Sequence, residues 1–215
     1  MGLFSRLRGR KPDAEARGES VQARLEALAQ LDPKWSTETL RRRVRDVFFA
    51  VERSWIERDP SVGEPYMAPQ LGASQRLRIE GLVRQRRVHQ LENPLIEDLD
   101  FVAADEAAPS VTALLDMSLV ETILDADSGA LVAGRAGEKV RRRQYWTFDW
   151  DGEWKLADVE QPDAGARHLT APLVGGDFAE LGPEMILRER YARGEIEIEQ
   201  FESEMAVLLQ REPTN

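Results

Sequence analysis

Apolar residues near the start of the chain recur with a helical period. Four of them follow one another at intervals of three and four residues and so share one helix face: Val21, Leu25, Leu28 and Leu31. Asp32-Pro33 comes next, and a residue before proline disfavours helical backbone. We therefore expect a helix that ends near Leu31. The polar, small-residue stretch 11–20 before it is interpreted as a linker.

The next stretch has the clearest helical pattern in the chain. Ser36 is suited to cap its first turn, and Asp59-Pro60 ends it. Its apolar stripe consists of Leu40, Val44, Val47, Phe48, Val51 and Trp55. The opposite face carries the charged residues Arg41, Arg42, Arg45, Glu52 and Arg53. A stripe of this kind predicts a helix packed on a core.

A third helix is expected from Pro69, a residue favoured at the first helical position, to about Arg87. Its apolar contacts are less regular and comprise Leu71, Ile79, Leu82 and Val83. It also carries five arginines, so we place it on the surface, where it covers one side of the domain.

After Asn93-Pro94 the period changes from helical to alternating, which is typical of strands. One strand is expected over 95–104, and a longer one follows. One face of the longer strand is apolar: Val111, Ala113, Leu115, Met117, Leu119 and Ile123. A turn is expected at 127–129, and Gly134 and Gly137 are expected to keep the next segment loose.

The run Arg141–Val159 alternates around Asp151-Gly152 and predicts a β-hairpin. A two-residue loop would pair Phe148 with Lys155. A three-residue loop, Trp150 to Gly152, keeps the aromatic residues opposite one another, and we adopt it. The pairs expected from it are Phe148 with Trp154, Trp146 with Leu156, and Thr147 with Lys155.

Helices followed by strands predict an α+β fold in which helices pack on an antiparallel sheet. The expected organisation is a basic flexible tail at 1–20, the α+β domain at 21–161, a linker at 162–182 and a short helical pair at 183–215. The first helix of that pair should start at Pro183 and end near Gly194. The second, over 196–210, groups the interaction residues Ile196, Phe201, Met205, Leu208 and Leu209. Because two short helices bury little alone, they should dock on a partner, on a second copy or on the main domain.

The composition is that of a globular chain, with 42% hydrophobic and 32% charged residues among 215. Cysteine is absent, which excludes disulfides and thiolate chemistry. The net charge of −10 argues against nucleic acid as the main partner. No run reaches the roughly 20 apolar residues of a membrane span. The basic start of the chain favours either a solvated tail or a weak membrane-surface anchor.

With these elements placed, the sequence resembles the Tim44-like family. The first matching residues are Leu31-Asp32-Pro33, Trp35, Phe48, Phe49, Trp55, Asp59 and the segment Met67 to Leu71. The most specific ones are Tyr145-Trp146-Thr147-Phe148, Trp154, Leu156, Ala157 and Val159. The resemblance covers roughly 31–161. It implies a cone-like fold of the nuclear transport factor two type, with helices on a strongly curved antiparallel sheet.

The resemblance also implies a non-catalytic role, in which the cone holds an apolar pocket and basic helices contact anionic lipid of the inner membrane. The pocket or core wall is then expected from Phe48, Trp55, Met117, Leu119, Trp146, Phe148, Trp154 and Leu156. The long amino-terminal region of the mitochondrial import-motor anchor has no counterpart, so a role in import is not carried over. The carboxyl-terminal pair resembles the short helical module called SHOCT, which is thought to mediate association.

Catalytic and metal-binding groups are sparse. We interpret His89 and His168 as surface residues, and the sequence suggests neither a metal site nor a cofactor. Cone folds can place an acid in an apolar pocket, where burial raises its pKa. The alternation places Asp100 and Asp116 outward and makes Asp158 the best inward candidate. Without a visible base or second acid, an isomerase-like enzyme is the weaker reading.

Clustered arginines in an acidic chain are either solvated faces or one surface facing anionic lipid. The residues expected on the lipid surface are Arg6, Arg8, Arg10, Lys11, Arg41, Arg42, Arg45, Arg84, Arg87, Arg141 and Arg143. Our leading hypothesis is a cytoplasmic adaptor, peripheral on the inner membrane, that binds a lipid or an inner-membrane protein and pairs with a partner or second copy through its terminal helices. The alternative is a soluble cone domain that binds a small molecule.

Overall fold

The computed structural model describes residues 11–171, 183–192 and 196–211. The helical part comes first and consists of α2 (Lys11–Leu31), η1 (Pro33–Trp35), α3 (Thr37–Glu57), α4 (Pro60–Gly63), η2 (Glu64–Tyr66) and α5 (Pro69–Arg84). The strands follow: β1 (Arg87–Asp105), β2 (Ser110–Asp125), β3 (Leu131–Trp150) and β4 (Trp154–Glu160). The fold is α+β, and the sheet is antiparallel in the order β1-β2-β3-β4.

The long helix α3 matches the pattern that predicted it. Its stripe residues Leu40, Val44, Val47, Phe48 and Val51 are buried, and Trp55 is partly buried. Ser36 occupies the cap position without a side-chain hydrogen bond to the helix. The helix ends where Arg58 adopts a left-handed conformation. Together with Leu25 and Leu28 of α2, the stripe fills the main core over one face of the sheet.

The first helix begins ten residues earlier than expected, so the interpretation of 11–20 as a linker is wrong. Ala14 is buried with Val102, Leu114 and Tyr145, which lie on the face of the sheet away from the main core. The Arg17 side chain also donates a 2.8 Å hydrogen bond to the backbone oxygen of Val102. These contacts with the sheet stabilise a helical start that has little apolar patterning of its own.

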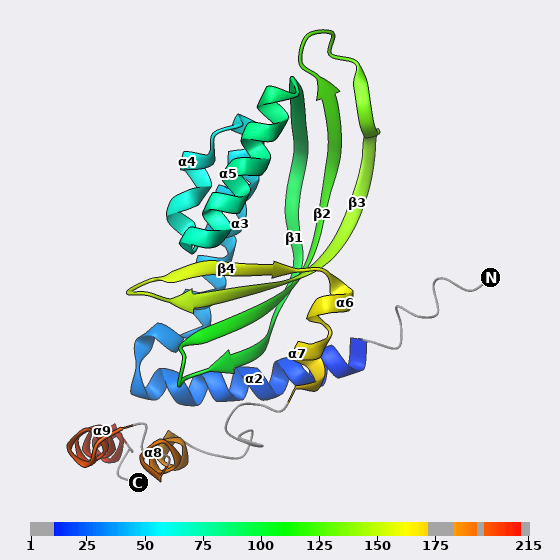
Figure 1. Cartoon of the computed structure of the whole chain (residues 1–215). Coiled ribbons are helices and arrows are strands. Elements are labelled where there is room, and N and C mark those ends of the chain that lie inside the picture. The colour runs from blue at the N-terminus through cyan, green and yellow to red at the C-terminus, as the bar shows by residue number, and fades with distance from the viewer. Residues whose placement is uncertain (1–10, 172–182, 193–195, 212–215) are drawn as a thin grey trace.

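The sheet bends because β1 is irregular. Its pairing with β2 shifts at three places, between 92 and 95, 96 and 98, and 101 and 103. Asn93 adopts a positive φ of 51° and precedes Pro94, which has no N–H to give to the ladder. Asn93-Pro94 is therefore a bulge inside a strand that starts at Arg87, and not the boundary expected from the sequence. Figure 1 shows β1, β2 and β3 turning sharply midway, as the cone-like fold requires.

The segment expected to be loose is the first part of β3. Residues 131–134 pair with β2, and pairing resumes at Lys139 after a four-residue bulge. Gly134 has a φ of 88°, and a Cβ there would lie 2.4 Å from the backbone oxygen of Glu121, so only glycine fits. Among the described residues, no strand pairs with the outer edge of β3 before Tyr145. We call residues 131–144 the free edge of β3.

The hairpin forms, but with a different register. Trp150 pairs with Trp154, Phe148 with Leu156, Thr147 with Asp158 and Trp146 with Val159. All three expected pairs are therefore wrong: Phe148 with Trp154, Trp146 with Leu156, and Thr147 with Lys155. The loop is three residues long but consists of Asp151, Gly152 and Glu153. The shift is two residues at Phe148 and three beyond the irregularity between Thr147 and Phe148, so Asp158 is exposed and does not face inward as expected. Trp146, Phe148, Trp154 and Leu156 are all buried, as the alternation indicated.

Part of the expected linker 162–182 is folded. Residues 162–171 form two one-turn helices, α6 (Pro162–Gly165) and α7 (Arg167–Thr170), while 172–182 lie outside the described residues. Gly165 is buried flat against the ring of Tyr145. His168 stacks on the same ring and contacts Glu160 at 2.8 Å. The segment thus covers the outer face of the sheet beside α2 (Figure 1).

The carboxyl-terminal helices α8 (Pro183–Ala192) and α9 (Ile198–Arg211) dock on the main domain, one of the three arrangements expected. Leu187, Ile196 and Leu208 are buried together against Leu31 of α2, and Phe201 and Met205 pack beside them. Ile186 reaches the main core. The side chain of Leu209 and the expected helix end at Gly194 lie outside the described residues.

Candidate functional site

An inner cavity of about 230 Å³ lies between α3, α5 and the core face of the sheet. Five of the eight residues expected for the pocket wall line it: Trp55, Met117, Leu119, Trp146 and Leu156. Phe48, Phe148 and Trp154 are buried in the main core instead. The inner cavity is therefore a gap in the apolar layer between helices and sheet, the setting in which small-molecule sites commonly occur.

The inner cavity adjoins an open groove of about 420 Å³, here called the mouth. Trp55, Arg78, His89 and Glu121 line both spaces. The remaining mouth residues are Gly81, Leu82, Gln85 and Ile123. The mouth thus leads from solvent, past the last turns of α5, to the wall of the inner cavity.

One acid of the inner cavity has no hydrogen-bond partner among the described residues. Glu52 on α3 is partly buried, and its carboxyl group makes no hydrogen bond to any described residue. Burial raises the pKa of Glu52 to about 7, and the nearby charge of Arg142 only partly opposes this effect. Near neutral pH the group is therefore divided between its acid and its carboxylate forms.

The opposite wall carries a connected chain of polar groups. His89 Nε2 lies 2.6 Å from Glu121 Oε1, and the other carboxylate oxygen of Glu121 pairs with Arg142. The indole of Trp55 meets the His89 ring edge-on, with centroids 5.5 Å apart. Burial, followed by the charge of Arg142, lowers the pKa of His89, so its imidazole is neutral at pH 7.

Both histidines were interpreted as surface residues, and for both this is wrong. Each is mostly covered and contacts a carboxylate, His89 with Glu121 and His168 with Glu160. Glu121 lies on the strand next to His89, and Glu160 lies eight residues before His168. Neither separation is a helical spacing, so the sequence pattern does not indicate these contacts. Asp158, the expected inward acid, is exposed. The acids that do line the inner cavity are Glu52 and Glu121.

We assigned Glu52 to the charged face of α3, but its spacing from the apolar residues indicates a position beside the apolar stripe. It lies four residues after Phe48 and three before Trp55, so it shares a side with both. Among the described residues, no group of three or more histidines, cysteines or acids could hold a metal ion. The inner cavity can therefore offer a ligand apolar walls, one exchangeable proton and a neutral imidazole.

A second space, the outer cavity, lies on the other face of the sheet and measures about 520 Å³. Asp100 and Asp116 line it, on the outward face expected for them. Arg143 donates hydrogen bonds of 2.7 and 2.5 Å to Asp116, which raise the pKa of the guanidinium. Its lining carries four acids and two arginines, and α2 contributes Ala14, Gly18, Glu19 and Gln22 to one wall.

Among the described residues, the arginines expected to contact lipid lie in different parts of the domain. Arg41 bonds to the backbone oxygen of Leu99 and lines the outer cavity with Arg143. Arg87 pairs with Asp125 at the far end of the sheet, and Arg84 pairs weakly with Glu80 at 3.7 Å. Arg42, Arg45 and Arg141 are exposed. Arg6, Arg8 and Arg10 lie outside the described residues, as does the side chain of Lys11.

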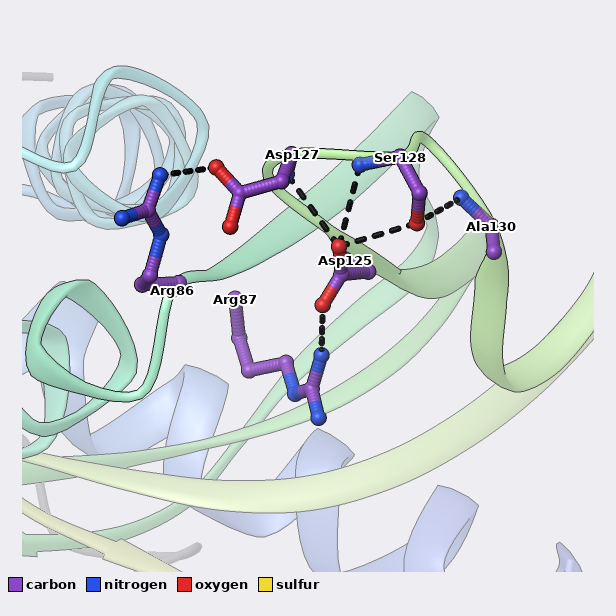
Figure 2. Close-up of polar contacts among 6 residues, drawn as sticks. All are labelled: Arg86, Arg87, Asp125, Asp127, Ser128 and Ala130. Carbon is purple, nitrogen blue, oxygen red and sulfur yellow. Dashed lines mark hydrogen bonds and ion pairs between the residues drawn. The ribbon is translucent and has the colours of Figure 1, made fainter.

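The end of the molecule beside the mouth is held together by a polar cluster. Arg86 pairs with Asp127, and Arg87 pairs with Asp125. Asp125 also accepts hydrogen bonds of 3.0 and 2.9 Å from the backbone N–H and hydroxyl of Ser128 (Figure 2). These contacts fasten the α5–β1 turn to the β2–β3 turn. We call the last turn of α5 together with residues 85–87 and 125–132 the hairpin end. The name refers to the hairpin of β2 and β3, and not to that of β3 and β4.

None of the helices in the described part of the chain has both the length and the apolar character needed to cross a membrane. No curated protein matches the sequence. The model of one protein family, the Tim44-like domain, matches residues 21–161, from the buried part of α2 through β4. That range covers well over half of the chain and contains both walls of the inner cavity, so the chain belongs to the Tim44-like domain family.

Proposed function

We propose that this chain is a non-catalytic adaptor that associates peripherally with the inner membrane and holds the apolar part of a lipid in its inner cavity. Membership of the Tim44-like family indicates a membrane-associated adaptor role at the level of the family, which is generally non-catalytic. The observation that carries the proposal is the inner cavity, which is apolar on most sides and continuous with the mouth.

The hairpin end supports the contact with lipid. Val83, Leu131 and Val132 are 47, 50 and 48% exposed there, next to the mouth. Exposed Arg78 and Arg84 on α5 add positive charge. Each basic residue near an anionic surface contributes about 1 kcal/mol, and inserted apolar side chains add to this. An acyl chain could then pass through the mouth without crossing water.

Flotation with vesicles of phosphatidylglycerol and phosphatidylcholine tests the membrane contact. The double variant Val83→Asp/Leu131→Asp should float at least several-fold less than the unchanged chain. Val207→Asp is the matched control, because Val207 is 45% exposed on α9, away from the hairpin end. A chain lacking residues 1–10 separates the contribution of the basic start from that of the hairpin end. Equal flotation of the double variant and the control would reject this contact surface.

Native mass spectrometry tests the cavity. Ser74 on α5 lines the inner cavity, and Ser74→Phe should fill part of it. The unchanged chain should retain a lipid through purification, and the variant should lose it while keeping its circular dichroism spectrum. A lipid retained equally by both would place the binding elsewhere.

The resemblance of α8 and α9 to a SHOCT-type module remains part of the proposal, since the family match ends at residue 161. In the docked arrangement Leu187, Ile196 and Leu208 pack against α2. They could contact a partner or a second copy only after α8 and α9 separate from α2. Mass measurement in solution tests this idea: release of the pair by substitution of Leu208 should increase self-association.

A second candidate, a soluble cone domain that acts on a small molecule, is favoured by one observation. Glu52 and His89 line the same apolar cavity, and such pairs can transfer protons. A chain that never floats with vesicles but retains a small molecule in the inner cavity would support this candidate over the adaptor.

A further inference from the structure

The position of Glu52 indicates what kind of ligand the inner cavity accepts. Its carboxyl group makes no hydrogen bond to a described residue, while apolar groups of Val51, Trp55, Met117 and Leu119 line the same space. A polar group in such a setting gains most from a ligand that supplies the missing hydrogen bond. The ligand should therefore place an oxygen atom close to Glu52.

The other charged groups of the cavity largely balance one another. Glu121 of β2 is shared between Arg142 of β3 and His89 of β1, and His89 is neutral. Arg78 of α5 is exposed at the mouth, in contact with water. These are all the titratable groups that face Glu52 from α5 and the three strands. Apart from Glu52 itself, which is uncharged in its protonated form, the described residues leave no uncompensated charge inside to offset a charged ligand head group, whose removal from water would be costly.

Protonation decides which form of Glu52 the ligand meets. The neutral carboxyl both donates and accepts a hydrogen bond, while the carboxylate only accepts. Since burial raises the pKa of Glu52 to about 7, the neutral form is the main one below neutral pH. An uncharged ligand with a carbonyl or hydroxyl oxygen can accept from this form, and it brings no charge of its own.

We propose that the inner cavity selects an uncharged apolar molecule bearing a carbonyl or hydroxyl oxygen, and that it binds this molecule through the protonated form of Glu52. This inference rests on the proposed binding in the inner cavity and adds the ligand class and a proton requirement. A neutral lipid or a lipid-like small molecule fits it. Fatty acids in their carboxylate form and alkyl amines do not.

The uncharged dye Nile red, which carries a carbonyl oxygen and fluoresces in apolar surroundings, serves as the probe. Its affinity for the full chain should fall about thirty-fold between pH 6 and pH 8.5, as the protonated fraction of a group with a pKa near 7 does. Decanol should displace the dye, whereas decanoate and decylamine should compete weakly. Ser74→Phe should abolish the signal and so shows that the dye occupies the inner cavity.

Variants identify the titrating group. Glu52→Gln keeps a hydrogen-bond donor but cannot ionise, so its affinity should stay high and constant across this range. Glu57→Gln, on the exposed side of the same helix, should keep the thirty-fold change. His89→Gln removes another titratable group of the cavity wall and should leave the ratio of the affinities at pH 6 and pH 8.5 set by Glu52, since burial lowers the pKa of His89. Equal affinity of the unchanged chain at both pH values would overturn the proposal. So would a pH-dependent Glu52→Gln, or decylamine as the preferred ligand.

The outcomes separate this inference from the proposed function. Loss of flotation with an intact dye profile would reject the membrane role and leave the ligand class standing. Normal flotation, a lipid retained in the cavity and a dye affinity independent of pH would reject only the inference about Glu52.

Discussion

Arg24 of α2 is completely buried and forms an ion pair with Glu106, in the turn between β1 and β2. The pair joins the first helix to the sheet across 82 positions of sequence. Removing one partner of a buried pair leaves an uncompensated charge, so Glu106→Gln should cost about 3–5 kcal/mol of unfolding free energy. Urea titration measures this cost.

Replacement of both partners checks the explanation. Arg24→Met/Glu106→Leu removes both charges, and should be closer in stability to the unchanged chain than Glu106→Gln is. Glu26→Gln, exposed on the same helix, should change the free energy by less than about 0.5 kcal/mol. A double variant less stable than Glu106→Gln would contradict this explanation. It would mean that the attraction between the two charges exceeds the free-energy cost of removing both from water.

Gly165 packs against Tyr145 so closely that a Cβ would lie 2.0 Å from the ring atom Cδ2. Gly165→Ala should therefore force α6 off the ring and cost about 1–3 kcal/mol. Combining it with Tyr145→Leu, which frees the space, should cost less than the sum of the two single changes. Strict additivity in thermal or urea unfolding would contradict the contact.

Glu52 should make stability depend on pH. Its pKa is about 7 when folded and about 4.5 when unfolded, so the folded state binds more protons between these values. The contribution of Glu52 to stability is then most favourable below pH 4.5 and falls as the pH rises through 7. Glu52→Gln cannot ionise, so at pH 8 its free energy of unfolding should exceed that of the unchanged chain by up to about 3 kcal/mol. At pH 4 the two free energies should be almost equal. A gain of equal size at both pH values would contradict a titrating Glu52.

The docking of α8 and α9 can be tested with one substitution. Leu208→Asp puts a charge among Leu187, Ile196 and Leu31, and should release the pair from α2. Hydrogen exchange should speed up in α8 and α9, with little change in the sheet. Val207→Asp, at the neighbouring exposed position, should leave exchange unchanged. Unchanged exchange in Leu208→Asp would show that the pair does not depend on this contact.

Local sequence patterns predicted most of the elements. The stripe of α3 was long and regular, and β4 formed within the run that predicted the hairpin, because each element has a clear periodic pattern of apolar and polar residues. The register of the hairpin could not be fixed in this way, since a shift of two residues leaves the same side chains buried. The start of α2 was missed because its stability comes from contacts with the distant strands β1 and β2.

The polar part of the candidate site was harder to predict than its apolar wall. Trp55, Met117 and Leu119 follow from periodicity alone. Glu52 and Arg24 are charged residues at positions whose spacing belongs to an apolar face, and a sequence pattern treats such residues as solvated. His89, Glu121 and Arg142 come from three strands and meet only through the register of the sheet. Their contacts depend on bulges that no local pattern specifies.

The free edge of β3 has a consequence for solubility. Its unpaired backbone groups could attract strands of other molecules and begin aggregation. The bulge at 135–138, the left-handed Gly134 and Gly137, and the closely spaced charges of Arg135, Glu138 and Lys139 all oppose a flat, regular partner. The long sheet that walls the cavity can therefore extend well past its last partner strand while the protein stays dispersed in a crowded cell.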